Sequence, residues 1–310
     1  MRVLVAGRTG QLALELLARL PADGHTVVAR EAPELDLTDP ASIARTVEET
    51  RPEAVVNAAA YTAVDRAETE RDLAHAVNAT GAGALAAAAA ARNLPFVHLS
   101  TDYVFSGAGG APYAEDAPTG PLGVYGETKL AGERAVLAAS PRAIILRTAW
   151  VCSPHGANFV KTMLRLGRER EAVSVVADQH GAPTFAADLA DAIARLLPRL
   201  AAAPAGDPAF GVFHLTGTPH TTWHGFAEAI FAGAAARGQR PPQLSAITTA
   251  DYPTPARRPA DGRLDCARIA RLHGIQPADW RPSLARCLDT LLGPIPPGST
   301  PSGPTPETPR

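Results

Sequence analysis

Short apolar segments alternate with longer alanine- and leucine-rich segments over the first 150 residues, and this alternation most constrains the fold. Five segments are uniformly apolar and bounded by Gly, Pro or polar residues, which predicts buried strands at 2–6, 26–29, 54–59, 96–100 and 143–148. Helices are expected at 10–19, 40–50, 69–92 and 125–139. The alternation predicts an α/β fold with a doubly wound, Rossmann-type parallel sheet that binds ligands at the carboxyl ends of its strands.

The pattern becomes less regular after residue 150. It predicts helices at 157–170, 186–198 and 223–237, two terminal helices, and strands at 172–176 and 211–215. We expect a nucleotide-binding domain over 1–152, with 172–210 completing its sheet. Residues 153–171 and 211–293 are expected to form a smaller α/β substrate-binding domain. The proline-rich segment 294–310 predicts a disordered tail.

Composition excludes several other classes of protein. The 29 Lys and Arg residues nearly balance the 31 Asp and Glu residues, so no overall basic charge favours nucleic acid or an anionic membrane. The three cysteines form no C-x-x-C pair, which argues against a disulfide framework or a cysteine-rich zinc site. Neither a signal peptide at MRVLVAG nor a long apolar span is evident, so we expect a cytoplasmic protein.

A glycine-containing turn follows the first predicted strand and opens the first helix. Gly7 and Gly10, followed by Gln11 and Leu12, would expose backbone N–H groups to a pyrophosphate that approaches without meeting a Cβ atom. Ala13 stands where the third glycine of the usual motif would be. The position of the turn favours a dinucleotide site, although a plain structural turn explains this segment alone equally well.

The end of the second strand bears on which dinucleotide binds. A carboxylate there favours NADH, whereas an arginine pairs with the 2′-phosphate of NADPH. Arg30 ends this strand and Arg8 lies in the glycine turn, which favours NADPH, with NADH as the alternative. Both arginines could instead be solvated, and Glu31 next to Arg30 could partly neutralise it.

Tyr125 and Lys129 begin a predicted helix beyond the fourth strand. Their four-residue spacing places both side chains on nearly the same helix face. An ammonium beside a phenol stabilises the phenolate and lowers its pKa, which would suit the phenol to proton transfer. Ser100 and Thr101 close the fourth strand, where a hydroxyl could bond the reacting carbonyl oxygen. Two solvated side chains remain the alternative for the spacing alone.

Longer segments carry a resemblance to a known family. They are GRTGQL (7–12), NAAAYTAVDRAE (57–68), STDYVFSG (100–107), YGETKLAGE (125–133), RTAWV (147–151), NFVKTMLRL (158–166), DQHGAPT (178–184) and YPTPARRP (252–259). With these segments the chain resembles the dTDP-4-dehydrorhamnose reductase family of the extended short-chain dehydrogenases/reductases. The resemblance implies NADPH-dependent reduction of the C4 keto group of dTDP-4-dehydro-β-L-rhamnose, the last step of dTDP-L-rhamnose synthesis.

The resemblance also assigns roles to individual residues. Tyr125 would donate the proton, Lys129 would bind the nicotinamide ribose and lower the pKa of the phenol, and Thr101 would bond the reacting oxygen. Asp102 and Trp150 would contact the sugar nucleotide. The remaining cofactor contacts implied in this way are Gly10, Gln11, Leu12, Asp36, Leu37, Ala60, Tyr61, Thr62 and Leu99.

The sequence departs from this family at two places and leaves other interpretations open. Arg30 stands where several relatives carry Asp, which favours NADPH. Some relatives form a magnesium-bridged dimer through glutamates; Glu15 matches one of these, but Ala187 stands where a partner is expected, so no metal is predicted. Either a monomer or a homodimer fits. Arg257 and Arg258 could clamp a diphosphate or be solvated. A sugar-nucleotide epimerase and a non-catalytic NADP-binding regulatory subunit are the alternative functions, the latter disfavoured by the intact Thr101, Tyr125 and Lys129.

Overall fold

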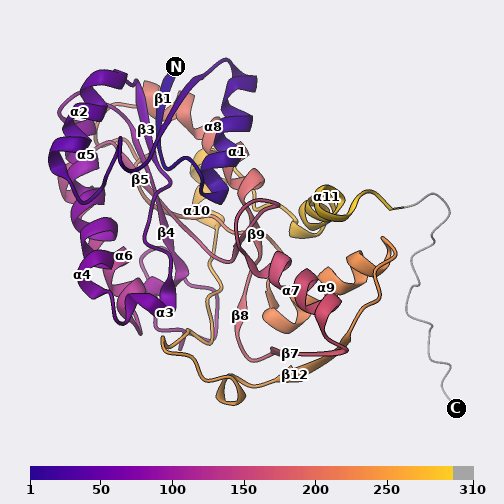
Figure 1. Cartoon of the computed structure of the whole chain (residues 1–310). Helices are drawn as coiled ribbons and strands as arrows, with labels where there is room; N and C mark the ends of the chain where they lie inside the picture. The colour runs from indigo at the N-terminus through magenta and orange to yellow at the C-terminus, as the bar shows by residue number, and fades with distance from the viewer. Residues whose placement is uncertain (296–310) are drawn as a thin grey trace, which may run out of the picture.

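Six parallel strands form the central sheet in the computed structural model, which describes residues 1–295 (Figure 1). The strand order is β10-β5-β4-β3-β1-β2. The bounds are β1 (Arg2–Ala6), β2 (Thr26–Arg30), β3 (Ala54–Asn57), β4 (Phe96–Thr101), β5 (Ala143–Thr148) and β10 (Gly211–His214). The predicted doubly wound Rossmann-type sheet is therefore confirmed.

Each face of the sheet is covered by helices. The helices of this lobe are α1 (Gln11–Arg19), η1 (Leu20–Asp23), α2 (Pro40–Thr50), α3 (Val64–Ala67), α4 (Arg71–His75), η2 (Ala76–Gly81), α5 (Ala82–Ala90), η3 (Asp102–Val104), α6 (Val124–Ala139), α8 (Ala186–Ala202) and α10 (Ala267–His273). Strand β1 is buried on both sides: Val3 and Val5 face α1 and α8, whereas Leu4 and Ala6 face α2 and α5. This is why β1 is apolar at every position from Val3 to Ala6.

The run α4–η2–α5 is a single helical stretch with a π-helical segment in its middle. By length and composition, Arg71–Ala90 could cross a membrane, and 44% of that window is buried inside the protein. It packs against α6. On another side Gly81 meets Leu37, and a glycine is needed because a Cβ atom would lie 2.1 Å from the Leu37 carbonyl oxygen. The stretch therefore serves as a covering helix of the central sheet.

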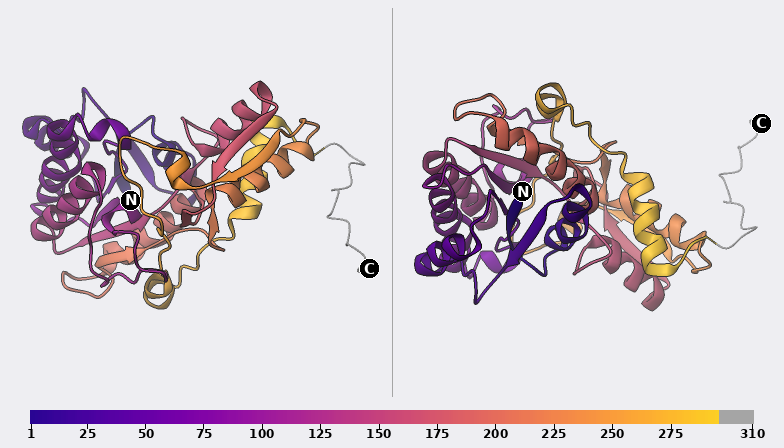
Figure 2. Two further views of the ribbon diagram at one scale, coloured as in Figure 1. Left: turned by 90° about the horizontal axis from the view of Figure 1, so that it is seen from below. Right: turned by 90° about the horizontal axis from the view of Figure 1, so that it is seen from above.

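A smaller lobe lies beside the large one (Figure 2). It contains β6 (Val151–Cys152), α7 (Phe159–Glu169), β7 (Ala172–Val176), β8 (His180–Gly181), β9 (Thr184–Phe185), β11 (Thr221–Thr222), α9 (Trp223–Ala235), β12 (Gln243–Ile247), η4 (Thr249–Asp251) and α11 (Trp280–Leu292). Apolar residues of α7, α9 and α11 form its separate core.

Two strands lie in places other than those expected. Segment 172–176 does not extend the central sheet but pairs in parallel with β12, a strand that the sequence did not indicate. Strand β10, expected in the smaller domain, is the edge strand of the central sheet and pairs with β5. Both placements depend on pairing between distant segments, which local apolar patterns do not encode. The division into two domains otherwise stays a prediction, and the tail expected over 294–310 lies almost wholly outside the described residues.

Candidate active site

The glycine turn has the geometry of an anion-binding loop. Gly7 has φ +104°, a conformation that side chains disfavour, and its N–H group donates to the Arg30 carbonyl at 2.7 Å. Helix α1 begins immediately after Gly10, so its N-terminal N–H groups point toward the turn. Ala13 fills the space beneath Gly7, which confirms that a small residue suits that position.

The turn already binds a carboxylate of the chain itself. Glu31 Oε2 accepts hydrogen bonds from the backbone N–H groups of Arg8 and Thr9, both at 3.1 Å, and from the Thr9 hydroxyl at 3.0 Å. Its other oxygen lies 3.7 Å from the Arg8 guanidinium. Arg30, expected to meet a 2′-phosphate, donates instead to the Ala29 carbonyl at 2.9 Å. Glu31, which the sequence indicated only as a partial neutraliser of Arg30, is thus the residue that contacts the backbone N–H groups of the turn.

The other expected cofactor residues fall into two groups. Ala60, Tyr61 and Thr62 follow β3 at the same sheet edge as the glycine turn, and Leu99 lies in β4. By contrast, Asp36 accepts from the Thr38 backbone and hydroxyl, and Leu37 is buried against η2. Both Asp36 and Leu37 therefore have partners within the chain.

Gln11 and Tyr61 show such partners. Gln11 accepts hydrogen bonds from Ser153 at 3.0 Å and Asn158 at 2.8 Å, so its side chain joins α1 to the segment after β6. The Tyr61 hydroxyl donates to Glu70 at 2.6 Å. Both side chains therefore have partners within the chain.

Tyr125 lies in the first turn of α6, at the carboxyl end of β4. Its ring is half-buried and meets Tyr103 edge-on, with 5.5 Å between ring centroids. Burial, with a smaller contribution from nearby Asp102, raises the pKa of Tyr125 to about 12, although Thr101 acts in the opposite direction. The phenol is therefore protonated at neutral pH, the state that donates a proton.

Lys129 is buried one helical turn further along, and its ammonium donates to the Leu99 carbonyl at 2.6 Å. Burial lowers the pKa of Lys129 to about 8, which Glu133 opposes. Burial dominates the pKa of Tyr125 here, so a lowering of that pKa by Lys129 stays a prediction. The two side chains do share one helix face beside Thr101, as their spacing predicted.

Asp102 is fully enclosed beside this pair. It accepts a hydrogen bond from the Thr101 hydroxyl at 3.0 Å, and burial raises its pKa to about 7. Gly262, from the C-terminal half, packs against it so closely that a Cβ atom would lie 2.4 Å from Asp102 Oδ2. A buried carboxyl group thus lies between the end of β4 and a segment from the C-terminal half.

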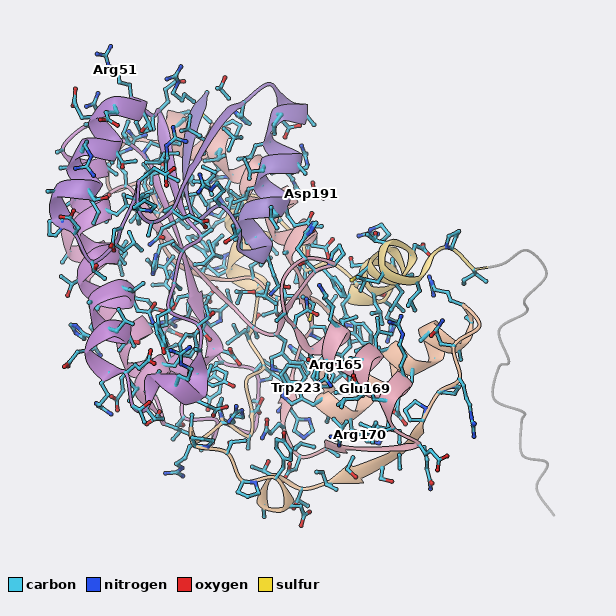
Figure 3. All side chains as sticks on the ribbon, in the orientation of Figure 1. Arg51, Arg165, Glu169, Arg170, Asp191 and Trp223 are labelled. Atoms are coloured by element: carbon cyan, nitrogen blue, oxygen red, sulfur yellow. The ribbon has the colours of Figure 1, made fainter. Side chains whose placement is uncertain are left out.

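Trp150 follows β5 with φ +49°, which is unusual for a large side chain. Its indole stacks on Trp223, with ring centroids 3.6 Å apart. Gly181 packs against the opposite edge, where a Cβ atom would lie 2.5 Å from the ring. Trp223 is the first residue of α9 and is labelled in the smaller lobe in Figure 3, so the stack joins the end of β5 to the smaller lobe.

The loop 252–262 crosses from the smaller lobe to the large one. Arg258 contacts both carboxylate oxygens of Asp65, at 3.1 and 2.9 Å, and Asp65 also accepts from the Ala256 backbone. Pro259 packs on Gly107, where a Cβ atom would lie 2.6 Å away. Arg258 thus fastens the loop, while Arg257 beside it is exposed.

Sequence reasoning missed several residues that shape the site. Asn78 in the π-helical segment bonds the Tyr61 backbone N–H at 2.8 Å and the Thr128 hydroxyl at 3.1 Å, which couples the β3 edge to α6. Glu68 accepts from the N–H group of Val124 and so caps α6. Local patterns do not indicate either contact, although π-helical segments often lie at functional sites.

No metal site accompanies this arrangement within residues 1–295. Glu15 lies 3.6 Å from His155, and no group of three or more His, Cys, Asp or Glu side chains there is placed to hold a metal ion.

Comparison with known proteins places the chain among named relatives. It is 44% identical to a dTDP-4-dehydrorhamnose reductase of Sinorhizobium fredii over 292 residues, which cover 94% of this chain and 98% of the relative. A dTDP-4-dehydrorhamnose reductase structure from Clostridium acetobutylicum has a TM-score of 0.87 and 35% identity, and covers 94% of this chain and 99% of its own.

A third relative was solved with a ligand. The dTDP-4-dehydrorhamnose reductase from Bacillus anthracis, in complex with NADP, has a TM-score of 0.86 and 35% identity, covering 93% of this chain and 99% of its own. The family model described as the RmlD substrate binding domain matches residues 1–292. The expected resemblance is confirmed, and the chain belongs to this family of dTDP-4-dehydrorhamnose reductase relatives.

Proposed function

We propose that this protein reduces the C4 keto group of dTDP-4-dehydro-β-L-rhamnose to give dTDP-L-rhamnose, the last step of dTDP-L-rhamnose synthesis. The observation that carries the proposal is the meeting of Tyr125, Thr101 and Lys129 at the sheet edge that also holds the glycine turn. A proton donor and a dinucleotide-binding turn at one edge suit the reduction of a carbonyl group.

The glycine turn supports a dinucleotide as the cofactor. Its N–H groups at Arg8 and Thr9 bind the Glu31 carboxylate, so they are already oriented toward an anion. Gly7, Gly10, Gln11 and Leu12 would hold the cofactor there. The Bacillus anthracis relative was solved with NADP, which favours NADPH as the cofactor here, with NADH as the second substrate to test.

Each residue of the site then has a defined task. Bound NADPH supplies the hydride. Tyr125, protonated at neutral pH, gives its proton to the oxygen at C4, and Thr101 donates a hydrogen bond to that oxygen as negative charge develops. Lys129 holds the ribose hydroxyls of the cofactor.

A nucleotide sugar is the partner that this site would take. Asp102 and Trp150, beside Tyr125 at the sheet edge, would contact the sugar. The relatives' names support the dTDP-linked keto sugar as substrate. All three cysteines are buried free thiols, which fits a reducing cytoplasm; both a monomer and a homodimer fit the proposal.

A direct turnover assay tests the proposal. The purified protein, NADPH and dTDP-4-dehydro-β-L-rhamnose should lose absorbance at the reduced-nicotinamide band, with one NADPH consumed for each sugar. Tyr125→Phe should lower kcat by about a hundredfold or more. Tyr252→Phe is the control, because that tyrosine is 61% exposed and has no role in the proposed proton transfer.

The same assay separates the alternative functions. An epimerase would interconvert sugars without net consumption of NADPH, and a regulatory subunit would bind NADPH without turnover. Full activity of Tyr125→Phe would show that Tyr125 is not the proton donor and would contradict the proposed mechanism.

A further inference from the structure

Helix α6 and strand β4 meet residue by residue behind the proton donor. Tyr125, Lys129 and Glu133 are spaced by four, so they follow one face of α6. They face three consecutive positions of β4. Thr101 lies beside Tyr125, the Ser100 hydroxyl donates to Glu133, and the Leu99 carbonyl accepts from Lys129. The pair of Ser100 and Glu133 has no role in the mechanism above.

Glu133 is fixed more firmly than either of its neighbours. It is buried, and Arg147 of β5 contacts both its oxygens, Nε to Oε1 at 2.9 Å and Nη2 to Oε2 at 2.8 Å. Arg147 lies opposite Ser100 in the sheet register, and Ser100 donates to the same Glu133 oxygen. One carboxylate thus joins the helix to two adjacent strands.

A buried ion pair of this kind adds little net stability, because removing two charges from water costs about as much as their attraction returns. Its position beside a functional lysine calls for another explanation. Glu133 lies one helical turn beyond Lys129, and it is the carboxylate that opposes the effect of burial on the pKa of that ammonium.

Other charged or titratable groups face this part of the site. His98 of β4 is buried beside Lys129 and bonds Asn57 at 3.1 Å; burial lowers its pKa, so it is neutral. His214 of β10 lies behind Arg147, at 3.4 Å. Asp102 lies on the other side, next to Tyr125. Among these groups, Glu133 is the carboxylate that shares a face of α6 with Lys129, one helical turn away.

We propose that Glu133, fixed by Arg147 and Ser100, is a positioning residue that keeps Lys129 protonated and aligned with Tyr125. The inference rests on the proposed reductase function for its kinetic consequence. Its effect on the charge of Lys129 can be measured without turnover, because a protonated Lys129 also favours the binding of an anionic dinucleotide.

The test compares pH profiles of wild type and Glu133→Gln, a variant that keeps the shape of the side chain and removes its charge. Two readouts are measured from pH 6 to 10: kcat/KM, and the Kd for NADPH from its fluorescence. In the variant, the loss of activity and of binding at alkaline pH should begin about one pH unit lower, because Lys129 loses its proton more easily. Glu133→Asp should restore most of the wild-type profile.

A matched control separates this effect from lost stability. Asp289 pairs with Arg237, a second buried arginine, in the smaller lobe, with 2.6 Å between Arg237 Nη2 and Asp289 Oδ1. Asp289→Asn removes this carboxylate. This variant should lower the unfolding midpoint without moving either pH profile. If Glu133→Gln does not fold, Glu133→Gln/Arg147→Met removes both buried charges together and should move the profiles in the same direction by a smaller amount.

The outcomes distinguish the two proposals. Wild-type protein that binds NADPH but does not reduce the keto sugar would overturn the proposed function, and the Kd profile would still test Glu133. A folded Glu133→Gln, or the double variant in its place, with unchanged profiles would overturn the positioning role. A shift that Glu133→Asp does not reverse would likewise contradict it.

Discussion

The Cα atom of Gly126 lies against the Tyr103 carbonyl so closely that a Cβ atom would stand 2.2 Å from that oxygen. This contact seats the first turn of α6, and therefore Tyr125, on the end of β4. Alanine normally stabilises a helix interior relative to glycine. Here we expect Gly126→Ala to lower the free energy of unfolding by about 3 kcal/mol and to reduce turnover sharply, because α6 must move away.

Urea denaturation together with the reductase assay checks this expectation. Gly120→Ala is the matched control, since its Cβ atom would meet Ser106 at an ordinary distance of 3.5 Å. An unchanged unfolding midpoint for Gly126→Ala would mean that the helix can shift at no cost, contrary to the packing described.

The sequence predicted the parts of this molecule that depend on local pattern. The first five strands of the central sheet and most of their helices lie where apolar runs indicated them, because a strand buried on both faces must be apolar throughout. The face shared by Tyr125 and Lys129 followed from helical period alone. The pairing of β7 with β12 did not, because β12 is largely exposed and shows no buried pattern.

The site was less predictable than the fold. Glu31 reaches the glycine turn across 22 residues, Asn78 reaches Tyr61 across 17, and Trp223 meets Trp150 from another lobe. Each contact is between segments distant in the chain, so no spacing rule indicates it. Burial, which a single sequence does not reveal, dominates the pKa of Tyr125, so the spacing of Tyr125 and Lys129 alone does not determine it.

The position of Glu31 in the turn predicts its effect on cofactor choice. A carboxylate that holds the Arg8 and Thr9 N–H groups repels a 2′-phosphate and accepts hydrogen bonds from a free ribose. Glu31→Gln should therefore raise the ratio of kcat/KM for NADPH to that for NADH by about tenfold, or about 1.4 kcal/mol. Glu34→Gln, which removes the other carboxylate beside Arg8, should change the ratio much less.

The stack of Trp150 on Trp223 predicts a loss of substrate affinity when it is removed. Without the indole of Trp223, the strained Trp150 is held on one side only, by Gly181. An aromatic pair contributes about 0.5–1.5 kcal/mol, so Trp223→Ala should raise KM for the sugar nucleotide up to about tenfold with a smaller change in kcat. Trp223→Phe should have a KM between those of wild type and Trp223→Ala. Equal KM values for these three proteins would argue against a role of the stack in substrate binding.

The ion pair of Asp65 with Arg258 predicts a role in holding loop 252–262. The hydrogen bonds from Arg258 lower the pKa of Asp65, so the contact is fully formed above the ordinary carboxyl range and is lost only as pH falls below it. Asp65→Asn should raise KM for the sugar nucleotide several-fold at neutral pH. Glu169→Gln is the control, because it breaks the exposed pair with Arg165 on α7, whose residues are labelled in Figure 3. Equal KM values for both variants would count against a role of the ion pair in substrate binding.

His214 predicts how stability depends on pH. Its Nδ1 atom donates to the Tyr113 carbonyl at 3.0 Å and its Nε2 atom faces Arg147, so the ring is held neutral; burial and then Arg147 lower its pKa to about 3. A lowered folded pKa gives stability that is complete above the unfolded value near 6.5 and is lost as the pH falls toward 3. His214→Gln removes this titration and should flatten the loss of unfolding free energy between pH 6.5 and 4, by at most about 1.4 kcal/mol per pH unit. Urea midpoints at several pH values measure the slope, with the exposed His75→Gln as the control. Identical slopes for wild type and His214→Gln would show that other groups carry the acid sensitivity.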